Sequence, residues 1–283
     1  PGGVFQMKGN ALLRSNDARY VMPTQDEFMA TTNDQVKALI DHQLKTAPVE
    51  ITIVGDISED EAVAQVAKTF ATLPPRPAQP VIAPDAKTVA FPGNTHDYVF
   101  HHTGRKDQSI SRIYWPLFDF YTDIKQSHAA TILAAVLSER VREDVREKKG
   151  AAYSASAHVL TSHSIKGYGY LWADASIEAG DDHVFRDSIR EIVADLKAHP
   201  VSDDELTRVK KPLLEAFDNS GKNNAYWLNI LPDMGEHSRA LDAYLHTREG
   251  ISAVTAQEVQ DLARAYLKDD TAIYVQVLPE EKK

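Results

Sequence analysis

The sequence contains no cysteine among its 283 residues. This absence excludes thiol catalysis, cysteine-ligated zinc and a disulfide scaffold. It does not fix the compartment, because many periplasmic proteins also lack cysteine. The apolar content of 43% is ordinary for a soluble globular protein, and a chain of this length can bury a core without disulfides.

Positive charge is also scarce. The chain has 31 lysines and arginines against 41 acidic residues, which gives a formal net charge of -10 and argues against a nucleic-acid binder. No apolar run approaches the roughly 18 residues that indicate a membrane span, and no signal peptide is visible. The chain begins with Pro1 rather than methionine, so we expect it to be a fragment or a processed piece.

Several common catalytic motifs are missing. There is no Gly-x-Ser-x-Gly elbow, no P-loop and no dinucleotide fingerprint. Eleven histidines are present, but no helix carries the His-x-x-Glu-His spacing that a zinc hydrolase of this kind needs. The nearest match is Glu236-His237, where Asp233 stands in the place of the first histidine. We therefore predict no metal site and no cofactor in this chain.

The hydrophobic pattern predicts a long helix over residues 125–148. Its apolar stripe recurs every four residues, at Leu133, Leu137, Val141 and Val145. The remaining pattern predicts further helices, among them 32–45, 58–73, 182–199 and 255–267. It also predicts strands over 48–56, 88–91, 98–102, 109–117, 152–160, 165–175 and 272–278.

The end of the long helix carries the main candidate site. Gly150 suits the left-handed cap that follows a helix, and an extended run begins directly after it. Arg146 lies in the last helical turn and Tyr153 at the start of the strand, so a guanidinium and a phenol can meet at one spot. Such a pair can donate hydrogen bonds to a carbonyl oxygen or an oxyanion. The alternative is that Arg146 is simply solvated and that Tyr153 belongs to the core. The spacing of the two residues alone favours this alternative.

A second polar and aromatic patch includes Asn224 and Tyr226, next to Asn223 and Trp227. One interpretation is a secondary functional site. The other is a helix cap followed by core aromatic residues, which the pattern favours.

One segment of the chain is repeated. Residues 32–45 match residues 255–268 at five positions, and an extended apolar segment follows each copy. We interpret this repeat as two homologous domains of which the first lacks its beginning. The predicted division is 1–80 for the C-terminal portion of the preceding domain, 81–87 for a proline-rich linker, and 88–283 for a complete domain.

Residues 146–154 read Arg-Glu-Lys-Lys-Gly-Ala-Ala-Tyr-Ser, which resembles the Arg-Glu-x-x-Gly-x-x-Tyr-Ser motif of the insulinase/pitrilysin family of zinc metallopeptidases. Residues 54–56 resemble the end of that family's domain-closing strand, and Leu73-Pro-Pro-Arg-Pro resembles its linker. Residues 201–210 resemble the start of a helix of the family, and the patch at 222–228 resembles that of its large bacterial members. The resemblance covers the whole chain.

The resemblance implies an α+β fold, with LuxS/MPP-like metallohydrolase two-layer domains in which a mostly antiparallel sheet packs against helices. It implies that this chain is the inactive C-terminal half, and that zinc and the catalytic machinery belong to an N-terminal half that is not in this chain. Arg146 and Tyr153 match the arginine and tyrosine that such a half sends to the substrate carbonyl. The implied partners are the catalytic half and a peptide that adds to an exposed sheet edge.

A competing hypothesis remains open. The chain could be a non-catalytic structural or assembly subunit of the same fold, like a processing-peptidase subunit or a respiratory core protein. The presence of Arg146 and Tyr153 favours the peptidase half. For location, the resemblance favours the periplasm or cell envelope of a Gram-negative bacterium, and the sequence itself indicates no compartment.

Overall fold

The computed structural model describes residues 1–78, 82–83, 85–93 and 97–280. The chain divides into two compact units. The first contains residues 1–22, 87–215 and 243–283, and the second contains residues 23–86 and 216–242. The division falls within two helices, α8 (Asp203–Ser220) and α10 (Ala240–Ala253). A further cut, between residues 86 and 87, falls within the predicted linker at 81–87, but the first unit also takes in residues 1–22. The predicted division, which concerns the repeat in the sequence, stays a prediction.

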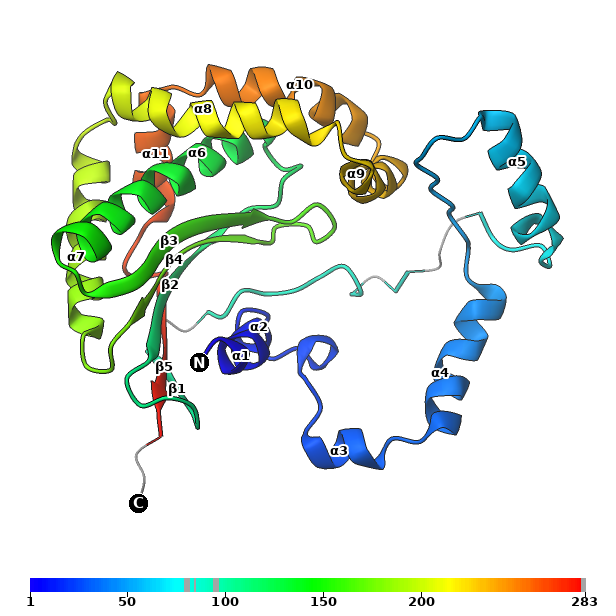
Figure 1. Cartoon of the computed structure of the whole chain (residues 1–283), viewed down its shortest axis with the longest axis horizontal. Coiled ribbons are helices and arrows are strands. Elements are labelled where there is room, and N and C mark those ends of the chain that lie inside the picture. The colour runs from blue at the N-terminus through cyan, green and yellow to red at the C-terminus, as the bar shows by residue number, and fades with distance from the viewer. Residues whose placement is uncertain (79–81, 84, 94–96, 281–283) are drawn as a thin grey trace. The chain divides into compact units, whose positions relative to one another are not determined.

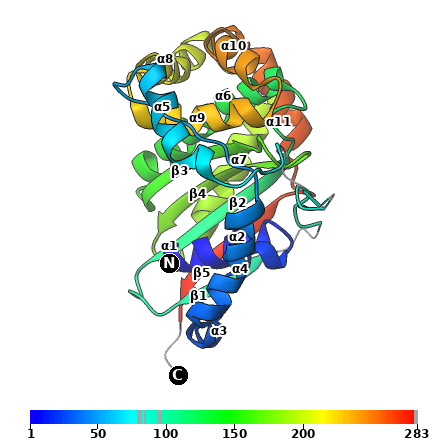
Figure 2. The ribbon, with the colours of Figure 1, turned by 90° about the vertical axis from the view of Figure 1, so that its right-hand side faces the viewer.

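A five-stranded sheet forms the centre of the first unit. Its strands lie in the order β1-β5-β2-β4-β3, and Figure 2 shows them one after another from β3 to β1. Only the β1–β5 pair is parallel, so the sheet is mostly antiparallel. The strand bounds are β1 Tyr98–His102, β2 Ser109–Leu117, β3 Ala152–Thr161, β4 Gly169–Ile177 and β5 Ile273–Pro279.

Three helices cover one face of this sheet: α6 (Ile124–Val141), α7 (Asp182–Ala198) and α11 (Ala256–Tyr266) (Figure 1). The apolar stripe predicted for the long helix is confirmed, since Leu133, Leu137, Val141 and Val145 are fully buried in this layer. The α+β arrangement expected from the resemblance, a mostly antiparallel sheet packed against helices, is therefore present.

The N-terminal segment covers the other face of the sheet. It consists of α1 (Gly2–Val4), a π-helical turn (Phe5–Gly9) and α2 (Asn10–Leu12). Its side chains form a second core with tyrosines of β2 and β4, in which the Phe5 and Tyr114 rings stack 6.2 Å apart. The Arg112 guanidinium lies 3.9 Å from the Phe5 ring centroid and pairs with Asp174. Both faces of the sheet are thus covered.

The second unit contains α3 (Gln25–Ala30), α4 (Asn33–Thr46), α5 (Glu59–Lys68) and α9 (Asn224–Glu236). The first three of these begin with capping boxes, including the predicted Ser58–Glu61 pair. None of the three buries a single residue. Local hydrogen bonding therefore defines these helices, while their apolar side chains remain exposed.

The prediction of strands over 48–56 and 88–91 is wrong. The first of these segments has no regular secondary structure, and it pairs with no strand in the described part of the chain. A β-strand is stabilised by ladder hydrogen bonds to a neighbour, so the alternating pattern of Val49, Ile51 and Ile53 is not sufficient by itself. All three of these side chains are exposed.

The repeat in the sequence has very different surroundings in its two copies. In the second copy, Leu262 of α11 is 4% exposed, and Ile273, Val275 and Val277 of β5 are fully buried. The residue of α4 that corresponds to Leu262 is Leu39, which is 76% exposed. One copy therefore completes a core, and the other presents the same apolar pattern to solvent.

No helix of the described residues is long and apolar enough to span a membrane.

Candidate functional site

The last turns of the long helix are not α-helical. After Val141 the helix continues as a π-helix from Arg142 to Lys148, and the amide of Lys149 donates to the Asp144 carbonyl five residues earlier, at 3.0 Å. π-helical turns are rare and are frequent at functional sites. Gly150 then adopts φ +62°, which confirms the predicted left-handed cap. Arg146 lies within this π-helix.

Tyr153 occupies a second irregularity. Ala152 pairs with Ile177 of β4 and Ser154 pairs with Ser176, so two steps along β3 match one step along β4. Tyr153 is the extra residue of this β-bulge, and its side chain is 89% exposed. Bulges redirect side chains and are over-represented beside active sites. The alternative of a core tyrosine is therefore wrong.

The charges around Arg146 are paired with one another. Arg142 pairs with Glu147, Lys148 lies 3.2 Å from Glu143, and Lys149 lies 2.7 Å from Asp144. Lys149 also donates to the Ser188 hydroxyl of α7, at 2.8 Å. Burial raises the pKa of Asp144, but the hydrogen bonds from Lys149 and Ser188 outweigh it and lower that pKa overall.

Arg146 differs from all of these neighbours. Its guanidinium is exposed and has no ion-pair or hydrogen-bond partner among the described residues. The Tyr153 hydroxyl is likewise without a partner in the described part of the chain. Five guanidinium N–H groups before Gly150 and one phenol O–H after it are therefore available as hydrogen-bond donors. Donors of this kind can hold and polarise a carbonyl oxygen.

The residues that the structure describes bring together no set of side chains that fits a zinc ion. No group of three histidine, aspartate or glutamate side chains converges to hold a metal within the described residues. His102 and His158 contact a backbone carbonyl and the Ser156 hydroxyl, at 2.8 Å and 3.0 Å. His163 stacks on Phe120, with ring centroids 4.3 Å apart. The side chains of Asp233 and Glu236, next to His237, and all of His96 lie outside the described residues.

The secondary candidates belong to the second unit. Asn224 begins α9 and is exposed, and Tyr226 is half-buried with its ring 5.6 Å from that of Trp227. The residue that caps the helix is Asn223, whose side chain accepts from the Ala225 amide at 2.8 Å. The helix-cap interpretation of this patch is thus confirmed for Asn223, while a functional role of Asn224 and Tyr226 stays a prediction.

A family profile described as "Peptidase M16 inactive domain" matches residues 30–213. The chain belongs to the peptidase M16 inactive-domain family. The predicted membership of the inactive half of these metallopeptidases is thereby confirmed. The matched residues of this M16 inactive domain include both Arg146 and Tyr153, while Asn224 and Tyr226 lie beyond them.

Curated relatives of the M16 inactive domain are chloroplastic stromal processing peptidases. The Arabidopsis thaliana enzyme is 21% identical over 312 residues, which cover 92% of this chain and 24% of that protein. The Oryza sativa subsp. japonica enzyme is 21% identical over 294 residues, which cover 89% of this chain and 24% of that protein. The chain thus spans about a quarter of the length of these relatives.

Solved structures share the fold. A protease from Helicobacter pylori superposes with a TM-score of 0.80 at 15% identity, covering 99% of this chain and 67% of that one. A peptidase M16 inactive domain from Pseudomonas fluorescens gives a TM-score of 0.77 at 18% identity, covering 100% and 67%. The Escherichia coli periplasmic protease PqqL gives 0.73 at 16% identity, covering 99% and 31%. These similarities confirm the predicted fold class.

Proposed function

We propose that this chain is the non-zinc-binding half of a zinc metalloendopeptidase and that it acts on the peptide held by a catalytic half. The observation that carries the proposal is the arrangement at the end of the long helix. Arg146 and Tyr153 are exposed and unpaired in the described part of the chain, whereas every other charged residue from 142 to 149 has an ion-pair partner. If this helix end had only a structural role, Arg146 would not need to differ from its ion-paired neighbours.

Each of the two side chains has a role in the proposal. The Tyr153 hydroxyl donates to the carbonyl oxygen of the scissile peptide bond, and the Arg146 guanidinium holds that carbonyl or the neighbouring one. In other enzymes, a single donor of this kind contributes about 3–4 kcal/mol to the stability of the transition state. The zinc and the base that activates water belong to the catalytic half, which is the second partner in the proposal.

The substrate in this proposal is an extended peptide. Its supporting observation is that β3 lies at one edge of the sheet, with the bulge at Tyr153 near its start. A peptide that adds to this edge is held by backbone hydrogen bonds, a mode that tolerates many sequences. Asn224 and Tyr226 are secondary contact residues in the same proposal.

The proposed domain division also remains as predicted, with 1–80 as the C-terminal portion of a preceding M16-type domain and 88–283 as a complete one. It is supported by the exposed apolar residues of α4, which match buried residues of α11.

For location we propose the periplasm or cell envelope of a Gram-negative bacterium. The E. coli neighbour, which is described as periplasmic, is consistent with that location.

The test is a reconstitution. This chain is titrated with the zinc-binding half of the same protein, and the hydrolysis of a quenched fluorescent peptide is followed with zinc present. The proposal predicts no hydrolysis by the chain alone and saturable activity on mixing. A complex that forms but is inactive towards a panel of unrelated peptides would instead support the structural-subunit hypothesis. Activity of the chain alone that a chelator abolishes would overturn the assignment of an inactive half.

A further inference from the structure

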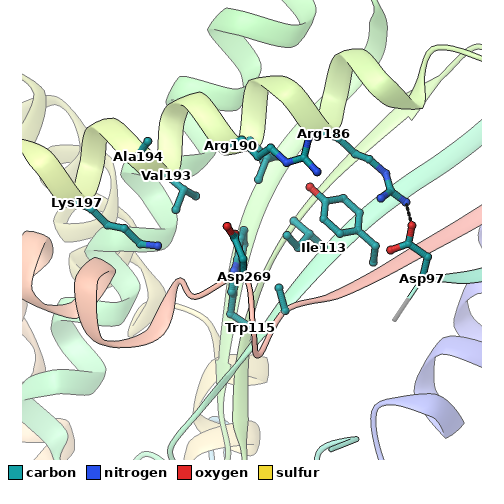
Figure 3. Close-up of a pocket in the computed structure, with 12 residues that line it drawn as sticks. Asp97, Ile113, Trp115, Arg186, Arg190, Val193, Ala194, Lys197 and Asp269 are labelled. Carbon is teal, nitrogen blue, oxygen red and sulfur yellow. Dashed lines mark ion pairs between the residues drawn. The ribbon is translucent and has the colours of Figure 1, made fainter. Parts of the chain in front are cut away.

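A pocket that the proposed peptidase role does not use lies between α7 and the sheet. It has a volume of about 350 Å³ and is lined by β2, by β5 and by one face of α7 (Figure 3). Arg186, Arg190 and Lys197 contribute its basic side chains. Because they stand at spacings of four and seven residues, they share one side of the helix. The volume lies within the range of small-molecule sites.

Three buried polar atoms of this pocket lack a hydrogen-bond partner in the described part of the chain. They are the indole Nε1 of Trp115, the hydroxyl of Tyr274 and the Nε of Arg186. Trp115 is only 1% exposed, so bulk solvent does not satisfy its indole N–H, which needs a partner on the pocket side. Burial raises the pKa of Tyr274 to about 12, so its hydroxyl keeps its proton at neutral pH. Since buried polar groups are nearly always paired in folded proteins, three orphaned donors in one pocket point to an acceptor that binds there.

The charges of the pocket also favour a negatively charged ligand. Arg186 pairs with Asp97 at 2.7 Å and stacks 4.1 Å from the Tyr274 ring centroid, so it is fixed in place. Arg190 has only a long contact of 3.4 Å to Asp187, and the Lys197 ammonium has no ion-pair partner among the described residues. Asp269 also lines the pocket and is its one carboxylate besides the paired Asp97. Asp269 offsets one of the two weakly engaged cations, Arg190 and Lys197, so the pocket keeps one net positive charge for an anion.

The rest of the lining is apolar. Ile113 and Ala272 come from the sheet side, and Ile189 and Val193 come from α7. An inorganic ion would leave this apolar wall without contacts, whereas an anion with a short hydrocarbon tail covers it. We propose that this pocket binds an organic carboxylate, with the carboxylate facing Trp115, Arg190 and Lys197 and its tail against the apolar wall.

The same chemistry is available from two sources, a free organic acid and the C-terminal carboxylate of a peptide. Three probes separate them: hexanoate, N-acetyl-alanyl-leucine with a free carboxylate, and the amide of that dipeptide. The neutral analogue hexanol and inorganic sulfate are the controls for the tail alone and for charge alone. Saturable binding of hexanoate only would indicate a free acid. Binding of the dipeptide acid but not its amide would indicate a peptide terminus. Either result supports the proposal.

The readout is the indole N–H region of a ¹H–¹⁵N spectrum of this chain. Its three tryptophans give three indole signals, and Trp115→Phe identifies the one in the pocket. Hexanoate or the dipeptide acid is expected to move the Trp115 signal saturably and to leave the other two in place. Arg190→Gln and Lys197→Gln are expected to weaken binding at least tenfold, while Lys166→Gln, an exposed lysine outside the pocket, leaves it unchanged.

Because Arg190 is exposed, we expect Arg190→Gln to fold normally. It can therefore be tested even if the buried substitution Trp115→Phe prevents folding. The proposal is overturned if neither acid moves the Trp115 signal at millimolar concentration. It is also overturned if hexanol or sulfate moves that signal equally, or if Arg190→Gln and Lys166→Gln bind alike. None of these outcomes depends on peptidase activity, so the two proposals can fail separately.

Discussion

The amide of Ala151 donates to the carbonyl of Val145 at 3.0 Å, and this bond closes the turn between Arg146 and Tyr153. Val145 is fully buried beneath the turn, and Gly150 supplies the positive φ that the chain needs to reverse direction. The two candidate residues are therefore held on either side of one short, hydrogen-bonded turn. Their positions depend on its geometry.

The first prediction concerns that turn. Gly150→Ala should lower the free energy of unfolding by about 1–2 kcal/mol, because a side chain at φ +62° is strained even where space is free. If the proposed function holds, it should also lower peptide hydrolysis by the complex with the catalytic half, because it displaces Arg146 relative to Tyr153. Urea unfolding and peptide hydrolysis measure the two effects. Gly55→Ala, at a glycine without positive φ and with equally free space, is the matched control.

A second prediction follows from the repeat. Leu39→Glu should change the free energy of unfolding by no more than about 0.5 kcal/mol, because that side chain is exposed. Leu262→Glu, at the matching position of α11, should cost more than about 3 kcal/mol or prevent folding, because it places a carboxylate in the core. Urea unfolding of both variants tests this difference. Equal losses would show that α4 is packed as α11 is.

The close approach of α10 to α6 gives a third prediction. A Cβ added at Gly250 would lie 2.1 Å from the Nδ1 of His128, a buried residue of α6. Gly250→Ala should therefore cost about 1–3 kcal/mol of stability through overpacking. Gly221→Ala, whose Cβ would meet its neighbour at an ordinary 3.6 Å, should be nearly neutral. Differential scanning calorimetry of the two variants provides the comparison.

His128 also gives a prediction for pH. Burial lowers the pKa of its imidazole in the folded chain below the ordinary 6.5. As the pH falls below about 6.5, the unfolded state binds the proton more readily than the folded state, so the free energy of unfolding should decrease. Above that pH the residue is neutral in both states and contributes no slope. His128→Gln should flatten the dependence between about pH 7 and pH 5.5; an unchanged slope would assign it to other groups.

Much of the fold could be predicted from the sequence, because local patterns determine it. The stripe from Leu133 to Val145, the cap at Gly150 and the five paired strands all follow from periodicity and turn chemistry. The segment around Ile51 is not a strand, although its pattern predicts one, because alternating apolar residues do not supply the neighbouring strand that pairing needs.

The details of the candidate site were less accessible. An α-helix and a π-helix of one turn show nearly the same apolar spacing, so residues 142–148 could not be distinguished as π-helical. The bulge at Tyr153 is a property of the register with β4, and the pattern of β3 alone does not contain it. The pocket beside α7 combines Asp97, Trp115, Arg190 and Asp269. These residues are far apart in the chain, so no local motif could indicate it.

The most direct test of the account is the peptidase activity of the complex between this chain, carrying Tyr153→Phe, and its catalytic half. Because the hydroxyl is exposed and unpaired in the described part of the chain, its removal should leave urea unfolding unchanged. It should lower kcat/KM for a quenched fluorescent peptide by on the order of 10²-fold. The control is Tyr20→Phe, at a tyrosine of the N-terminal segment whose ring lies 4.5 Å from the Arg14 guanidinium, and it should have no effect. Full activity of the Tyr153→Phe complex would contradict the central claim that this half contributes a donor to the substrate.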